Sequence, residues 1–423
     1  MKRVLVLVLA ACGGNDHHTI DAGPIDALTD SLPVSGDGAP GGVQLHVTQG
    51  GHPVAQVATF FLASDDRVVS AVTTNDGGIA AASLSDGSVT AVLHAGGIDR
   101  LWTFTGVHAG DILELTLDPP GPATADNVMV SAPVAAGAYD YGLFSGCGDR
   151  ANSLDATFVF TPRGCGATAD FVITVNDMLD VPQAALVARG VSLASPTIAG
   201  AYVPVVTPAF TYSGGGGVVT SVDTRVQLLA PHGVLYAADD LQPASGGAVT
   251  THVRLPDTTG LAMSADVVTL IYPAASELGQ QTIHDVVDPA VPYSLDLAGA
   301  MLPRYTNAPA YDVASRALVW GEAPGGTAAT MVRAAIHATR DAFPTGRSWA
   351  WQIVAAKTGT NVTFPALPPL NGFSFVPAPG DTVGVDDLTT SNVPYAATRG
   401  FMDPGHGVTS GRVAIETLYA PPM

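Results

Sequence analysis

Short runs of alternating apolar and polar residues recur along the chain from residue 42 onward, separated by glycine, proline, asparagine and aspartate. The clearest are residues 43–47, 68–72, 89–93, 113–117 and 171–175. A period of two places successive side chains on opposite faces of a β-strand. Turn signals between short strands, here about every 8–15 residues, are typical of β-sandwiches. The pattern therefore predicts an all-β protein built from tandem β-sandwich domains.

Two segments allow more than one interpretation. Residues 328–340, AATMVRAAIHATR, are rich in alanine and could form a helix, but their neighbours are strand-like and we expect a strand. Residues 214–217 are four consecutive glycines. No Gly-Lys-Ser/Thr follows them, so they are not a phosphate-binding loop, and we expect the tip of a hairpin.

The charged residues are unusual in kind. Only four of the 37 acidic residues are glutamates, and only two of the 17 basic residues are lysines. Glutamate and lysine favour exposed helices, whereas aspartate favours turns, so few helices are expected. Codon bias in a GC-rich genome would give the same composition. A net charge of −20 excludes nucleic acid as a partner, because nucleic-acid binding needs a basic face.

The first residues have the pattern of an export signal. Lys2 and Arg3 precede an apolar run, residues 4–11, that is only about 12 Å long as a helix and too short for a bilayer core of about 30 Å. Residues 1–11 are therefore expected to be a signal peptide. Residues 12–41 combine acidic residues, glycine and proline without an aromatic residue, which predicts a disordered tether.

Residues 9–12, Leu-Ala-Ala-Cys, resemble the lipobox of bacterial lipoproteins. The resemblance implies cleavage before Cys12 and attachment of diacylglycerol and an N-acyl chain such as palmitate to that cysteine. Two or three acyl chains make a stable anchor, whereas one does not. The expected location is thus the bacterial cell envelope, at the outer membrane, and the expected partner of the N-terminus is the membrane itself.

Two further resemblances suggest the domains. Residues 50–55 and 73–78, GGHPVA and TTNDGG, resemble the two turns of the carboxypeptidase regulatory-like, or transthyretin-like, sandwich, which is usually non-catalytic, and place such a domain at residues 42–118. Residues 300–423 resemble a fibronectin type III domain in the segments 317–320, 349–354, 361–368 and 411–419. The region between them, residues 119–299, is expected to hold one sandwich or two divided near residues 200–210.

With Cys12 assigned to lipid, Cys147 and Cys165 remain. Two cysteines in an exported chain favour a disulfide bond. A catalytic cysteine–histidine pair is the alternative, but no histidine is near either cysteine in the sequence.

Other candidate sites are weaker. Trp349 and Trp351 are two residues apart and share one face of a strand, where they could stack on glycans if the face is exposed or pack in a core if it is not. Aspartates at 239–240, 381 and 386–387 could bind Ca²⁺ or serve only as turn and cap residues.

The sequence contains no serine-hydrolase elbow, zinc motif or dinucleotide fingerprint. We therefore expect no catalytic residues, metal or cofactor. The expected role is structural or binding work at the cell envelope. The alternatives are an adhesin-like protein that binds glycans or envelope proteins, and an extracytoplasmic hydrolase whose catalytic residues form no known motif.

Overall fold

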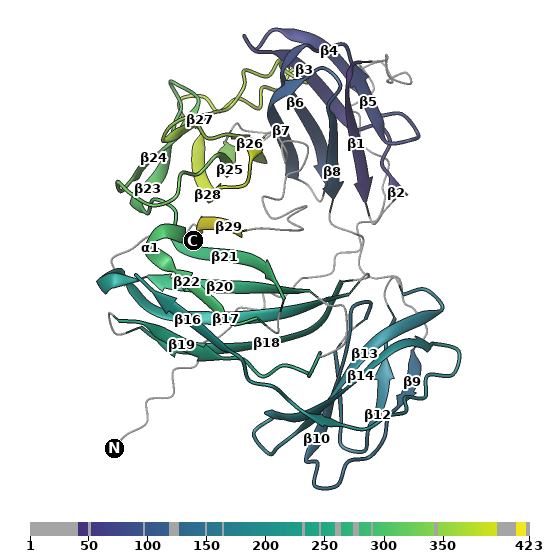
Figure 1. Ribbon diagram of the computed structural model, residues 1–423. Helices are drawn as coiled ribbons and strands as arrows, with labels where there is room; N and C mark the ends of the chain where they lie inside the picture. Colours follow the sequence, from purple (N-terminus) through teal and green to yellow (C-terminus); the bar gives the residue numbers. More distant parts are fainter. Residues whose placement is uncertain are drawn as a thin grey trace.

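The fold was taken from a computed structural model of the chain. It describes residues 41–49, 52–95, 98–117, 127–148, 150–162, 165–230, 233–244, 247–258, 264–273, 279–288, 291–341, 346–395 and 412–419. The helical segments whose two ends are both described are the 3-10 turn η1 (Gly216–Val218) and the single-turn helix α1 (Leu297–Ala300). The predicted fold class, all-β with sandwich-like packing of several sheets, is confirmed (Figure 1).

A twelve-stranded sheet forms the centre of the molecule. Its neighbouring strands are antiparallel except for the parallel pair β26 and β7. In spatial order the strands are β18 (Gly233–Pro243), β17 (Val219–Ala230), β20 (Ala265–Pro273), β21 (Gln280–Val287), β29 (Arg412–Tyr419), β28 (Thr382–Ser391), β25 (Met331–Arg340), β26 (Arg347–Ala356), β7 (Ile98–His108), β6 (Asp86–Ala95), β3 (Ala58–Ala63) and β4 (Val68–Thr73).

Hydrogen-bonded pairing in this sheet continues across the predicted boundaries at residues 118 and 299. The C-terminal strand β29 pairs with β21 on one side and β28 on the other. Strand β26 pairs with β7, almost 250 residues earlier in the sequence. One sheet thus takes strands from all three regions that were predicted as separate, residues 42–118, 119–299 and 300–423.

Five smaller sheets cover parts of this sheet or pack on one another. The strands of the N-terminal small sheet are β2 (His52–Pro53), β1 (Val43–Gln49), β5 (Ile79–Ala82) and β8 (Ile112–Leu117). The next two sheets consist of β11 (Ala151–Ser153), β10 (Asp140–Ser145), β13 (Thr168–Asn176), β14 (Pro182–Ser192) and β15 (Val203–Pro204), and of β12 (Thr157–Phe160) and β9 (Val128–Ser131). The last two consist of β19 (Val249–His252), β16 (Ala209–Ser213) and β22 (Tyr293–Asp296), and of β23 (Tyr305–Asp312), β24 (Ala317–Glu322) and β27 (Asn361–Thr363).

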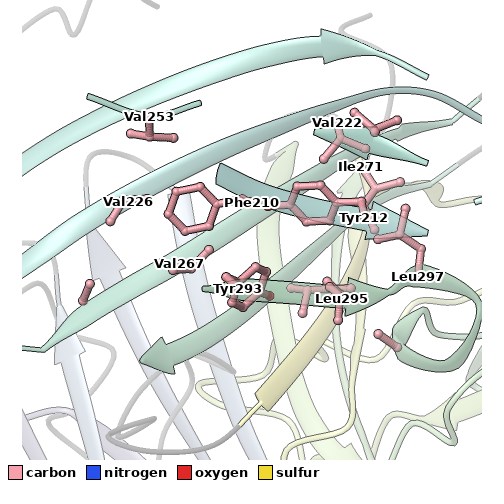
Figure 2. Close-up of a cluster of buried hydrophobic side chains, with 14 of the residues drawn as sticks. Phe210, Tyr212, Val222, Val226, Val253, Val267, Ile271, Tyr293, Leu295 and Leu297 are labelled. Carbon is pink, nitrogen blue, oxygen red and sulfur yellow. The ribbon is translucent and has the colours of Figure 1, made fainter. Parts of the chain in front are cut away.

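Four hydrophobic cores lie between these layers. Alternation in the sequence explains them, because every second side chain is buried in β8 and, from Val332 to Ala338, in β25. Figure 2 shows the core between β16 and the central sheet, where Phe210 and Tyr212 point toward side chains of β17 and β20. The buried Tyr212 hydroxyl is hydrogen-bonded to Thr224 (2.6 Å) and Thr269 (3.2 Å), so its polar atom has partners.

The two ambiguous segments have different outcomes. The alanine-rich segment is the strand β25, as expected, because its alternate residues enter a core. The glycine run is not a hairpin tip, since β16 before it and β17 after it belong to different sheets. Gly214 and Gly216 have positive φ angles of 75° and 56°, which let the chain cross between the layers there. No helix in the described part of the chain is long and apolar enough to cross a membrane.

Candidate functional site

The predicted glycan-stacking face is buried. Trp349 and Trp351 share one face of β26 as expected, but their exposed fractions are 1% and 0%. That face packs into the core formed with β23, β24, β27 and the segment that follows β27, where Trp351 meets Phe364 edge to face at 5.2 Å. The prediction that these tryptophans stack on a glycan is therefore wrong, and the alternative that they pack in a core is correct.

Cys147 and Cys165 form a disulfide bond with their Cα atoms 5.0 Å apart. The bond ties the segment after β10 to the segment before β13. With both sulfurs bonded to each other, neither is a catalytic thiol. The other predicted cysteine site, Cys12, lies outside the described residues, as does most of the predicted tether.

Three of the five candidate calcium-binding aspartates, Asp240, Asp381 and Asp386, are engaged by protein groups. Asp381 accepts two hydrogen bonds from the Arg340 guanidinium, which holds the pKa of that carboxyl below its usual range. Asp386 pairs with His337 at 2.5 Å, and Asp240 accepts the backbone N–H of His252. No group of three or more His, Cys, Asp or Glu side chains in the described ranges is placed to hold a metal ion.

A cluster of exposed apolar side chains, which the sequence analysis did not find, lies on the small sandwich β9–β14. In soluble proteins, contiguous exposed apolar patches mark interaction sites. The largest exposed fractions among large apolar residues in the described ranges are those of Leu154 (79%), Leu179 (77%), Met178 (76%), Val134 (75%) and Tyr139 (59%). We call these five residues the apolar tip.

Strand pairing brings the five residues to one end of this sandwich. They lie on three connections, residues 132–139 between β9 and β10, 154–156 between β11 and β12, and 177–181 between β13 and β14. The start of β10 pairs with the end of β11 on one side and with the end of β13 on the other, through Tyr141 opposite Ser153 and Asp140 opposite Asn176. Because paired strands lie about 4.8 Å apart, the three connections are neighbours.

Hydrogen bonds fix all three connections. In 177–181 the Asp177 carboxylate accepts the backbone N–H groups of Leu179 (2.9 Å) and Val181 (3.2 Å). In 154–156 the Asp155 carboxylate accepts the Ser153 hydroxyl (2.7 Å) and the Thr157 N–H (3.1 Å). These bonds hold the backbone so that the apolar side chains between them face solvent.

The connection between β9 and β10 is held in the same way. The Tyr141 hydroxyl accepts the N–H of Ala135 (2.8 Å) and donates to its carbonyl (3.3 Å). The Tyr202 hydroxyl donates to the Pro133 carbonyl at 2.9 Å. The apolar tip is thus presented by preorganised loops, which lowers the entropy that a partner must remove on binding.

Two of these connections contain residues in the left-handed region, Ala156 with φ 60° and Asp180 with φ 58°. This conformation is costly for alanine, at roughly 1 kcal/mol or more, and such strain is concentrated at functional sites. The disulfide lies at the opposite end of the sandwich from the tip, since β10 begins at the tip and ends just before Cys147. The sandwich therefore has a cross-linked end and an apolar end.

The sequence carried a local signal for this surface. Asn176-Asp-Met-Leu-Asp180 and Ser153-Leu-Asp155 have the aspartate and serine of turns, but large apolar residues in the positions where turns are usually polar. Which turns lie side by side depends on pairing between strands, which the sequence pattern does not show. No known protein family matches the chain, and no curated protein is significantly similar to it in sequence.

Proposed function

We propose that the protein is an exported, lipid-anchored protein of the bacterial cell envelope that binds a partner protein through the apolar tip. The observation that supports the proposal is the clustering of the five most exposed large apolar side chains of the described chain at one end of one sandwich. Five such side chains on fixed loops offer a compact, dry contact of the kind that forms the centre of protein–protein interfaces. No catalytic role is proposed.

The lipobox resemblance supports the anchored part of the proposal. An acylated Cys12 anchored in the outer membrane, followed by a tether of about 29 residues, would give a root-mean-square span of roughly 30 Å between the lipid and the folded chain. The carboxypeptidase regulatory-like and fibronectin-like resemblances fit the same role, because such sandwiches usually serve as spacers and binding modules. Figure 1 shows β9–β14 grouped apart from β1–β8, at the lower right of the molecule.

The anchor is tested by metabolic labelling with palmitate. Wild type is expected to incorporate the label and Cys12→Ser to lose it. Label that persists in Cys12→Ser would remove the anchored part of the proposal and leave the binding part standing.

The binding part is tested with immobilised protein and solubilised envelope from the source cells. The tip variant Leu154→Ser/Leu179→Ser is expected to lose a protein that wild type retains. The matched control is Ile112→Ser/Leu241→Ser, which removes two other exposed apolar side chains, and it is expected to retain that protein. Equal retention by wild type and the tip variant would contradict the proposal.

A further inference from the structure

Each connection that carries the apolar tip has an aspartate directly beside a tip residue, either within the connection or as the first residue of the strand that follows it. Asp140 follows Tyr139, Asp155 follows Leu154, and Asp177 and Asp180 enclose Met178 and Leu179. We call these four aspartates the acidic collar. Because each is adjacent in sequence to a tip residue, the four aspartates lie around the tip.

The collar is only partly neutralised. Arg150 lies 3.8 Å from Asp180, and both side chains are more than half exposed, so this ion pair is weak. Arg254 approaches the same region but donates to the Pro182 carbonyl. Arg189 pairs with Asp170 at the opposite end of the sandwich. A surplus of negative charge therefore remains at the tip.

Three of the collar carboxylates accept hydrogen bonds within their turns. Hydrogen bonds from the Ser153 hydroxyl and the Thr157 N–H lower the pKa of Asp155. The Asp177 carboxylate accepts two backbone N–H groups, and Asp180 accepts the Asn176 side-chain amide at 2.9 Å.

The negative charge of the collar distinguishes between three possible partners of the apolar tip: a membrane, a second copy of the chain and another protein. Anionic phospholipid would repel the collar, and insertion of the tip into any bilayer would bring aspartates into the headgroup layer together with it. A second copy of the chain would present the same collar, in a protein of net charge −20. A protein with an apolar surface bordered by lysine and arginine would be bound favourably by both the apolar tip and the acidic collar.

We propose that the apolar tip and acidic collar together recognise a basic protein partner, with an apolar contact at the centre and lysine or arginine side chains around it. This inference rests on the proposed function and specifies the chemistry of its partner. The tip supplies most of the affinity, since it is the part that water leaves on contact. The collar supplies selectivity and speeds association.

The test separates the two parts with two variants of the full chain. The tip variant is Leu154→Ser/Leu179→Ser. The collar variant, Asp155→Asn/Asp177→Asn/Asp180→Asn, removes three charges but keeps an oxygen acceptor for each turn hydrogen bond. The probe is a displayed library of random peptides of roughly twelve residues, whose selected members are then synthesised for affinity measurements at low and high salt.

Peptides selected by wild type are expected to combine arginine or lysine with large apolar residues. Their affinity should be lost in the tip variant, and it should fall about tenfold in the collar variant and in high salt. Peptides without basic enrichment, bound equally by wild type and the collar variant but not by the tip variant, would overturn the collar inference and leave the proposed function standing. Peptides bound equally by all three proteins would overturn both.

Two control measurements cover the other occupants. Sedimentation with phosphatidylglycerol vesicles, using protein without its acyl groups, is expected to show no binding. Analytical ultracentrifugation is expected to show no tip-dependent dimer. Vesicle binding or dimer formation that disappears in the tip variant would overturn the inference in favour of a membrane or of a second copy of the chain.

Discussion

Tyr305 is hydrogen-bonded twice to Glu416. Its backbone N–H donates to the Glu416 carboxyl at 3.3 Å, and its hydroxyl donates to the Glu416 backbone carbonyl at 3.3 Å. Glu416 is in β29, the strand that joins the two halves of the central sheet. Its side chain is almost fully buried, and its second carboxyl oxygen has no hydrogen-bond partner. The strand between the two halves of the sheet thus contains a buried carboxyl group whose surroundings stabilise the charged form poorly.

This acid makes stability depend on pH. Burial raises the pKa of Glu416 from 4.5 to about 8, and the negative charge of Glu322 acts in the same direction. The Tyr305 N–H, Arg304 and Gln281 lower this pKa, but by less than burial raises it. The folded chain therefore holds this proton more tightly than the unfolded chain does, and ionisation opposes folding. The free energy of unfolding should fall as pH rises from about 4.5 to about 8, by on the order of a few kcal/mol from this group.

Urea unfolding at about pH 5.5 and pH 8.5 checks this prediction for wild type and Glu416→Gln. The variant is expected to lose most of the decline with pH. Glu114→Gln, at an exposed position of β8, is the control and should behave as wild type. An undiminished decline in Glu416→Gln would show that another group is responsible.

The disulfide should stabilise the sandwich that carries the apolar tip. The bond closes a loop of 18 residues, for which chain entropy gives about 3 kcal/mol. Cys147→Ser/Cys165→Ser is expected to lower the free energy of unfolding, measured in urea, by about this amount. Hydrogen exchange should show faster opening of β10 and β13 than of β25 and β26. Uniform loss of protection across the chain would contradict a local role.

The imidazole of His337 occupies the space that a side chain at position 384 would need, so we expect glycine to be required there. A Cβ atom at position 384 would overlap that ring, which lies on the neighbouring strand β25 and pairs with Asp386. Gly384→Ala is therefore expected to destabilise the protein by about 1–3 kcal/mol. In a His337→Ala background the same change should cost little, and a double-mutant cycle measures the difference. Equal costs in both backgrounds would exclude the overlap as the cause.

Burial of Trp351 and exposure of Leu179 predict opposite effects of truncation. Trp351→Ala removes a fully buried ring whose indole N–H donates to Thr103 at 2.8 Å, and it should cost roughly 3–5 kcal/mol. Leu179→Ser removes an exposed side chain and should change stability by less than about 0.5 kcal/mol. Chemical unfolding of both variants measures this, and a large cost for Leu179→Ser would mean that the tip is structural.

Local patterns were enough to predict the strands, because alternation and turn residues act within a few neighbours. The stretches 43–47, 113–117 and 171–175 fall within β1, β8 and β13. The disulfide was also predictable, since only two cysteines remained after Cys12. The shared face of Trp349 and Trp351 follows from the strand period, but the period cannot say whether that face meets solvent or another sheet.

The remaining features depend on contacts between distant parts of the chain. Strand β29 enters the central sheet more than a hundred residues after its neighbour β21, and β26 pairs with β7 across a still larger separation. The apolar tip depends in the same way on β10 lying between β11 and β13. Leu154 and Leu179 are 25 positions apart and share an end of the sandwich only because of that order.

The central claim is tested most directly by photo-crosslinking on intact cells of the source organism, with benzoylphenylalanine in place of Leu179. The account predicts a discrete protein adduct at this position, its loss in the added presence of Leu154→Ser, and no adduct when the crosslinker replaces the exposed Ile112 of β8. No adduct at position 179, or the same adduct at both positions, would contradict a binding role for the apolar tip.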